Sequence, residues 1–192
     1  MKPYFQIHLL TIALFAVGGC GATVGKNVGG VPNLATVESG PDAIYRGGQP
    51  TQAGFKTLKQ MGVKTVINVR NDPVPWERDV VTENGMTYVN VPSSAERTSD
   101  KAVTAFLVAM SSAEYPVYVH CKRGRDRAGL AIACYRLVHQ PEEWTRQQAI
   151  EDLRRHGHQR LFFPGVERYL RSFNPSDLTM LAPALISAQS GG

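Results

Sequence analysis

The sequence predicts an α/β fold, in which one domain contains a mainly parallel sheet of four or five strands flanked by helices. Three observations predict it. The chain has 192 residues, 43% of them hydrophobic, which suits one domain with a substantial core. Short runs rich in β-branched residues alternate with longer stretches of helical periodicity. After the first twenty residues there is no long apolar run.

Strands and helices alternate from residue 44 onward. The run VKTVINV has few polar positions, which is typical of a buried parallel strand. Thr51 is placed to cap one helix, and Thr145 and Gln148 have the spacing of a capping box at the start of another. Strands are expected at 44–50 (with a turn), 63–69, 86–91 and 115–120, and helices at 51–61, 76–84, 100–112, 128–139, 145–157 and 164–173.

The N-terminus has the pattern of a targeting segment. Residues 1–19 combine one lysine, a short apolar stretch and small residues, as a secretory signal peptide does. The ending AVGGC resembles a bacterial lipoprotein box, in which the cysteine is acylated and becomes the mature N-terminus. We therefore expect lipidation of Cys20 and export, with the protein anchored to a bacterial membrane and facing the periplasm or the cell exterior. The outer membrane is preferred, because Gly21 is not the aspartate that resembles an inner-membrane retention signal. An uncleaved N-terminal anchor is the alternative.

The remaining boundaries follow from composition. Residues 20–41 are rich in glycine with little apolar periodicity, which predicts a flexible tether. The domain is then expected at 42–175, with a frayed tail at 176–192. Cys134 lies in an apolar helical stretch and is expected to be a small buried side chain, or else a resolving thiol. It is expected to lie too far from Cys121 for a disulfide.

The reactive groups of the chain concentrate in HCKRGRDRAG, residues 120–129, between a predicted strand and a predicted helix. Backbone amides of such a loop, together with the N-terminus of the following helix, bind anions. Arg127 is placed to hold two oxygens of a tetrahedral oxyanion through its planar guanidinium. Cys121 lies in the same positive field, which favours the nucleophilic thiolate, and Gly124 lets the loop curve. The pattern predicts a phosphate site with a nucleophile beneath it.

The spacing of His120, Cys121, Gly124 and Arg127 matches H-C-x-x-G-x-x-R, so the chain resembles the cysteine-dependent protein tyrosine and dual-specificity phosphatases. The segments IYRGGQPTQAGFKTLKQMGVKTVINVR and FPGVERYLRSF also resemble the atypical dual-specificity phosphatases of bacteria, plants and fungi. The resemblance covers residues 42–173. It implies a tyrosine phosphatase-like fold and a two-step hydrolysis of phosphomonoesters with no metal or other cofactor. Cys121 would attack phosphorus, Arg127 would bind the phosphoryl oxygens, and His120 would support the cysteine.

The resemblance leaves the general acid open, because the W-P-D loop of the classical family is absent. Asp126 is the first candidate, since myotubularin-type lipid phosphatases carry an aspartate at the same loop position. Asp100 and Glu96, which follow the strand at 86–91, are the alternatives. Each aspartate also has a structural interpretation: Asp126 as the partner of a flanking arginine, and Asp100 as a helix N-cap.

Two features of the loop bear on rate and substrate. Ala128 stands where the family usually has Ser or Thr, whose hydroxyl contacts the cysteine sulfur. Its absence predicts either slow breakdown of the phosphocysteine or a phosphate-binding protein that has lost turnover. One phosphate does not require all the positive charge that Lys122, Arg123 and Arg125 supply. These three residues and Gly124 are predicted to bind substrate. They fit an inositol phosphate about as well as a phosphorylated protein.

Other classes fit less well. A rhodanese-type sulfurtransferase also places a cysteine on an anion-binding loop, but it requires neither the preceding histidine nor the YRGGQP segment. A nucleotide-binding P-loop is excluded, because no Gly-Lys-Ser/Thr follows. Only the net charge of +5 favours nucleic acid, and export argues against it. We expect a monomer. Arg46 and Arg70 end predicted strands and either flank the cleft or pair with acidic neighbours, and the basic stretch 154–160 is expected to be a solvated surface.

Overall fold

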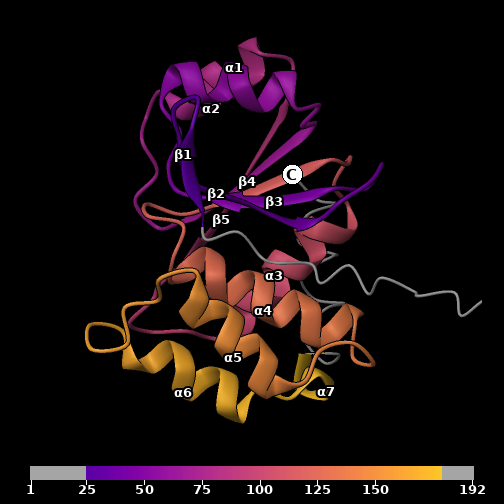
Figure 1. The fold of residues 1–192 in the computed structure, drawn as a ribbon, viewed down its shortest axis with the longest axis vertical. Helices are drawn as coiled ribbons and strands as arrows, with labels where there is room; N and C mark the ends of the chain where they lie inside the picture. Colours follow the sequence, from indigo (N-terminus) through magenta and orange to yellow (C-terminus); the bar gives the residue numbers. More distant parts are fainter. Residues whose placement is uncertain (1–24, 179–192) are drawn as a thin grey trace, which may run out of the picture.

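A computed structural model describes residues 25–178, which form a sheet between two layers of helices (Figure 1). The strands are β1 (Lys26–Val28), β2 (Val31–Glu38), β3 (Ile44–Gly47), β4 (Thr65–Arg70), β5 (Thr87–Ser93) and β6 (Val117–His120). The helices are α1 (Gln52–Gln60), α2 (Glu77–Glu83), α3 (Asp100–Ser111), α4 (Arg127–His139), α5 (Arg146–Arg155), α6 (Pro164–Ser172) and α7 (Pro175–Leu178).

The sheet has six strands in the order β1-β2-β3-β6-β4-β5. Four neighbouring strands, β3, β6, β4 and β5, are parallel to one another. At the β3 edge, β2 pairs antiparallel with β3, and β1 pairs antiparallel with β2. The predicted α/β fold with a mainly parallel sheet is confirmed. The sheet is larger than the expected four or five strands because of the hairpin β1–β2.

That hairpin corrects the tether expected at 20–41. Val28 pairs with Val31 across a two-residue turn, in which Gly29 (φ 54°) and Gly30 (φ 86°) adopt the positive φ values that such turns require. The glycines therefore form a tight turn rather than a flexible chain, and Val31 is fully buried. Residues 20–24 lie outside the described residues, as does the predicted signal peptide at 1–19.

Two apolar cores explain why the helices divide between the faces of the sheet. Side chains alternate along a strand, so Val66 and Tyr118 pack with α1 and α2, while Ile67 and Val119 pack with α3 to α7 on the opposite face. α4 lies at the centre of the larger layer (Figure 1). Leu178 at the end of α7 also packs into this core, so the expected tail at 176–192 begins as ordered helix; residues 179–192 are outside the described part.

The predicted helix starts at Thr51 and Thr145 are confirmed. Thr51 accepts a hydrogen bond from the Gly54 amide, and Thr145 and Gln148 form a complete capping box. Within residues 25–178, no helix is long and apolar enough to cross a membrane.

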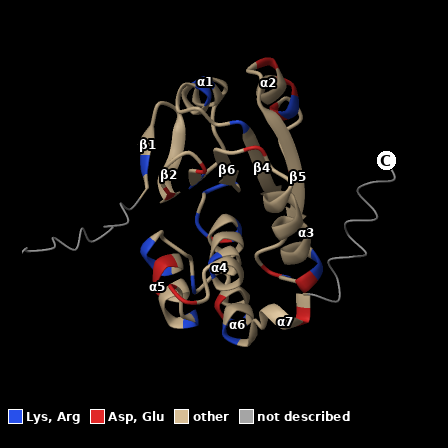
Figure 2. Ribbon diagram, turned by 90° about the vertical axis from the view of Figure 1, so that its right-hand side faces the viewer, with Lys and Arg blue, Asp and Glu red and all other residues tan. Residues whose placement is uncertain are grey.

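The parallel strands bring four connections to one edge of the sheet. β6 lies between β3 and β4, and His120 at its end is level with Gly47 of β3 and Asn68 of β4. The chain then passes from β6 into α4, as Figure 2 shows in a view turned by 90°. Ligands of open α/β sheets bind at the carboxyl ends of the strands, so this edge is the expected place for a site.

Candidate active site

The segment from Cys121 to Arg127, called here the phosphate loop, curves between β6 and α4. The Gly124 amide donates a hydrogen bond to Cys121 Sγ over 3.3 Å, and the cysteine is buried. Gly124 has φ 71°, and a Cβ at this position would lie 2.3 Å from the carbonyl carbon of Gly47. The loop thus requires glycine at 124, both for its backbone conformation and for its close contact with the end of β3.

Neighbouring segments hold the backbone of the loop. Asn33 of β2 donates a hydrogen bond to the Gly124 carbonyl oxygen over 3.1 Å. The Gln49 amide, after β3, donates to the Lys122 carbonyl oxygen over 3.2 Å. Arg46 of β3 donates to the same Gly124 oxygen from the buried side. The hairpin and β3 therefore form a rigid backing for the loop.

A cavity of about 230 Å³, called here the catalytic cavity, opens above the loop. It brings together Cys121, Lys122, Arg123, Asp126 and Arg127 of the residues that the sequence singled out. Arg125 does not line this cavity; its side chain lies beside Gly157 in the α5–α6 connection. The lining residues are Ala95, Cys121, Lys122, Arg123, Asp126, Arg127 and Phe163.

Arg127 is oriented by the connection after β4. Its Nη1 donates to Asn71 Oδ1 over 2.6 Å and to Asp72 Oδ1 over 3.3 Å. Asp72 also forms an ion pair with Arg70 at 3.0 Å, and Arg70 donates to Gln49. The hydrogen bond from Arg70, with a smaller contribution from Arg127, lowers the pKa of Asp72 to about 2, so the carboxylate is ionised at neutral pH.

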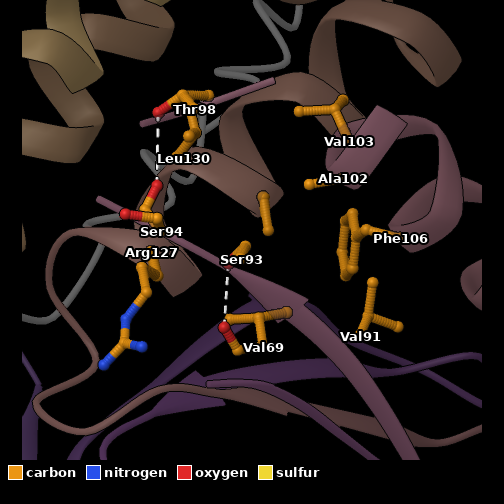
Figure 3. A pocket seen from close by; sticks show the side chains of 11 residues that line it. Val69, Val91, Ser93, Ser94, Thr98, Ala102, Val103, Phe106, Arg127 and Leu130 are labelled. Atoms are coloured by element: carbon orange, nitrogen blue, oxygen red, sulfur yellow. Dashed lines mark hydrogen bonds between the residues drawn. The ribbon is translucent and has the colours of Figure 1, made fainter. Parts of the chain in front are cut away.

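Arg127 also lies at the edge of a second, apolar cavity, whose lining is shown in Figure 3. Val69, Phe106 and Leu130 are among its walls, and the guanidinium of Arg127 points away from it. This cavity measures about 20 Å³, enough for a water molecule but not for a substrate.

His120 contacts a buried carboxylate. Its Nε2 lies 2.7 Å from Glu77 Oε1, and both side chains are fully buried. Asn68 donates to the other Glu77 oxygen over 2.7 Å, and the His120 ring stacks on Tyr118. His120 therefore has no access to substrate, which agrees with a supporting position. Sequence reasoning missed Glu77, since nothing in a helix start predicts a fully buried carboxylate.

Asp126 is buried, and its partner differs from the one expected. Oδ1 accepts hydrogen bonds from His158 Nδ1 over 2.6 Å and from the Gln159 amide over 2.9 Å. The ion pair expected with Arg125 or Arg127 is absent from the described residues. Both donors reach Oδ1, and neither occupies Oδ2.

The two alternative acids lie elsewhere. Asp100 is exposed and accepts a hydrogen bond from Tyr169 over 2.6 Å, and Glu96 is also exposed. Neither lines the catalytic cavity. The N-cap position expected for Asp100 is filled by Ser99, whose hydroxyl accepts the Ala102 amide. Among the three carboxylates, only Asp126 is close to the reacting groups.

Two further residues that the sequence singled out, Ala128 and Cys134, are both buried. Ala128 is fully buried at the start of α4. Cys134 is buried as well, burial raises the pKa of its thiol well above the usual range, and both described cysteines are free, so Cys134 has no property of a resolving thiol.

The stretch 154–160 is only in part the solvated surface that we expected. Arg154 and Arg160 both form ion pairs with Glu167 of α6, and His156 and His158 are buried. Arg155 and Arg160 are exposed to solvent, whereas the α5–α6 connection also contacts the phosphate loop. Arg123, for example, donates to Gln159 over 2.8 Å.

Residues 30–162 match the family model described as a DSP-PTPase phosphatase fused to NAD+ kinase. The chain belongs to this phosphatase family. The predicted resemblance to dual-specificity phosphatases is therefore confirmed. The match begins at residue 30, so this family model includes β2, which lies in the segment expected to be a tether.

Individual relatives agree with this assignment. The dual specificity protein phosphatase TpbA of Pseudomonas aeruginosa is 33% identical over 117 residues, which cover 59% of this chain and 51% of TpbA. The inositol diphosphatase DSP3 of Arabidopsis thaliana is 28% identical over 131 residues, covering 62% of this chain and 60% of DSP3. The chain thus spans about half the length of TpbA.

Solved structures confirm the fold. The crystal structure of TpbA superimposes with a TM-score of 0.65 at 27% identity, covering 79% of this chain and 91% of that one. The catalytic domain of the phosphatase SIW14 from S. cerevisiae superimposes with a TM-score of 0.61 at 20% identity, covering 73% and 86%. The second likeness is one of fold alone.

Proposed function

We propose that this protein hydrolyses phosphoric monoesters through a phosphocysteine intermediate. The observation that carries the proposal is the place of Cys121 at the base of the catalytic cavity, where Arg127, Lys122 and Arg123 supply positive charge around it. Membership of a phosphatase family supports the same reaction. A cationic site stabilises both the thiolate nucleophile and the phosphoryl oxygens.

In the first step, the Cys121 thiolate attacks phosphorus and forms an S–P bond. The bond between phosphorus and the leaving-group oxygen breaks, and that oxygen takes a proton from Asp126. Arg127 donates hydrogen bonds to the phosphoryl oxygens, where a bidentate guanidinium matches the geometry of the transferring group. Asn71 and Asp72 restrict Arg127 to the orientation in which it meets the substrate.

In the second step, water attacks the phosphocysteine. Its proton passes to the Asp126 carboxylate, the S–P bond breaks, and the electron pair returns to sulfur, releasing inorganic phosphate. Asp126 serves both steps because Oδ1 is occupied by two donors while Oδ2 remains to carry the proton. We expect Asp126→Asn to lower turnover far more than phosphate affinity; unchanged turnover would remove Asp126 from this role.

The substrates that we propose are phosphotyrosine or other phosphoproteins and inositol polyphosphates. TpbA has been crystallised with pTyr, and DSP3 is an inositol diphosphatase. In this chain, Lys122 and Arg123 line the cavity beyond what a single phosphate requires, which favours a substrate with several phosphates. Rates measured at varied salt separate the two, since a polyphosphate shows the steeper salt dependence.

The direct test is a phosphatase assay on phosphotyrosine, phosphoserine and inositol phosphate substrates, with Cys121→Ser as control. We expect phosphate release that is sensitive to vanadate in the wild type and lost in the variant. Equal release from both proteins would refute the proposal, because no other described residue is placed to attack phosphorus.

A second candidate, a phospholigand-binding protein without turnover, is favoured by Ala128. With alanine fully buried at this position, no hydroxyl at 128 can hydrogen-bond to the departing thiolate. We expect a phosphocysteine that accumulates and decays slowly, and that decays faster in Ala128→Thr. A rate of decay that is the same in both proteins would contradict this reading of Ala128.

For the cellular setting, we propose a monomeric lipoprotein that is exported and anchored through Cys20, with the outer membrane preferred. The support is the sequence up to Cys20. Labelling with a radioactive fatty acid in a bacterial host tests it: label is expected in the wild type and not in Cys20→Ser. Label in neither protein would contradict the anchor, and light scattering tests the monomer.

A further inference from the structure

Arg46 of β3 is a fully buried arginine directly behind the phosphate loop. It is 1% exposed, and its Nη2 donates hydrogen bonds to the carbonyl oxygens of Gly124 over 3.1 Å and of Arg125 over 3.4 Å. A buried guanidinium is expensive unless its charge and its donors are matched. The packing of β3 alone therefore does not explain why an arginine is buried at position 46.

Arg46 shares its nearest carboxylate with a second arginine. Asp152 lies 3.7 Å from Arg46 Nη1, but the same carboxylate oxygen accepts a hydrogen bond from Arg136 over 2.6 Å. Burial, and then the charge of Arg46, lower the pKa of His156, so this histidine is neutral at pH 7. Two arginines thus share the Asp152 carboxylate, and Asp126 is the other carboxylate whose charge acts on Arg46.

The positive charge of Arg46 persists at neutral pH. Burial lowers the pKa of Arg46 only to about 10, because Asp152 and then Cys121 favour the charged form. Arg46 Nε and Nη1 donate no hydrogen bond within the described residues, so the contacts of Nη2 with the loop are its only hydrogen bonds there. An anion in the loop is the group that this charge stabilises.

The two contacts also determine where backbone amides point. In a planar trans peptide, the C=O and the following N–H point in opposite directions. Carbonyls of Gly124 and Arg125 that are directed toward Arg46 therefore direct the N–H groups of Arg125 and Asp126 to the other side, toward the catalytic cavity. Neither of these amides donates a hydrogen bond in the part of the chain that the structure describes.

We propose that Arg46 is a positioning residue for the phosphate loop: by holding two carbonyls on the buried side, it aims two amides at the phosphate. The helix behind it accommodates this arrangement, since a Cβ at Gly129 would lie 2.8 Å from Arg46 Nη2. The inference rests on the proposed function, because it assumes that the loop binds a phosphate. Arg46 also places a buried cation near the Cys121 thiolate. The residue at position 128, an alanine, has no hydroxyl that could hydrogen-bond to this thiolate.

Binding of vanadate and inorganic phosphate to the full chain, measured by calorimetry, tests the proposal together with steady-state kinetics on an aryl phosphate. Arg46→Lys keeps a charge but loses the fork that reaches two carbonyls. We expect about a tenfold or greater loss of affinity for both anions, and a KM that rises more than kcat falls.

Arg136→Lys is the matched control, because Arg136 shares Asp152 with Arg46 but donates to no residue of the phosphate loop. We expect this variant to lose stability and to keep the anion affinity and the KM of the wild type. Equal anion affinity in Arg46→Lys and the wild type overturns the positioning role, as does an equal loss in both variants.

A measurement on the wild type keeps the proposal testable if Arg46 variants do not fold. In ¹H–¹⁵N NMR spectra, phosphate is expected to shift the amides of Arg125 and Asp126 strongly; phosphate that binds without shifting them overturns the proposal. A wild-type chain that binds neither anion refutes the proposed function and the role of Arg46 with it. Anion binding that is normal without any turnover refutes the function alone.

Discussion

His158 offers the sharpest test of the proposed acid, because the one hydrogen bond of its ring within residues 25–178 is made with Asp126. The side chain is fully buried, and Nδ1 donates to Asp126 Oδ1 over 2.6 Å. His158→Ala leaves Oδ1 with a single donor, the Gln159 amide. The carboxyl group is then less restricted, and Oδ2 spends less time facing the leaving-group oxygen.

The size of the effect follows from the bond that is lost. A hydrogen bond to a charged group contributes roughly 1.5–3 kcal/mol. If this orientation is needed only in the transition state, kcat falls by about 10- to 150-fold, at about 1.4 kcal/mol for each factor of ten. KM is expected to change little. The loss is expected to be larger for an alkyl phosphate than for an aryl phosphate, whose leaving group needs less protonation.

The assay compares kcat and KM of His158→Ala with those of His156→Ala on both kinds of substrate. His156 is also buried, but its Nδ1 contacts the Asp152 carbonyl oxygen rather than the phosphate loop. Urea unfolding checks that both variants are folded, since each deletion leaves a cavity. A kcat that is unchanged in His158→Ala, or lowered equally in both variants, would refute the assignment of Asp126 as the acid.

Three further outcomes are expected. Gly124→Ala abolishes vanadate binding measured by calorimetry, since its Cβ would overlap the carbonyl carbon of Gly47; retained affinity would show that the loop has another conformation. Asp72→Asn lowers stability by less than about 1 kcal/mol, because the Asp72 carboxylate is exposed to solvent, although its partner Arg70 is buried. Since the pKa of Asp72 is lowered to about 2, this difference is present above about pH 4 and disappears as the pH falls toward 2, which thermal unfolding at several pH values checks. A difference that grows on acidification would contradict it. Glu77→Ala destabilises the fold by about 3–5 kcal/mol in urea unfolding, because it leaves His120 and Asn68 buried without their partner; a loss below 1 kcal/mol would contradict this.

The parts of the site that sequence analysis predicted are those whose contacts are local. The spacing of Cys121, Gly124 and Arg127 is set within one loop, so the strand, the curve and the helix start were all visible in the sequence. The alternation of strands and helices likewise predicted the parallel sheet. Asp126 was found in the same way, as a carboxylate inside the loop.

The parts that were missed depend on distant segments. His158, the partner of Asp126, is 32 positions away, and Arg46 approaches the loop from 78 positions earlier. Periodicity cannot show such pairs, because they arise only when β3, β6 and the α5–α6 connection pack together. Arg46 was noted as the end of a strand, but its burial was not predictable. Gly29 and Gly30 misled for a different reason: a tight turn and a flexible linker have the same composition.

The hairpin β1–β2 has a practical consequence for any truncated form of this protein. A fragment that begins at residue 42 would lose Asn33 and the Pro32 carbonyl that receives the Gly48 amide, and with them part of the backing of the phosphate loop. It would also expose the unpaired edge of β3, a site where sheets join between molecules. Such a fragment is expected to aggregate and to bind phosphate poorly, whereas one that begins at residue 25 keeps the whole sheet.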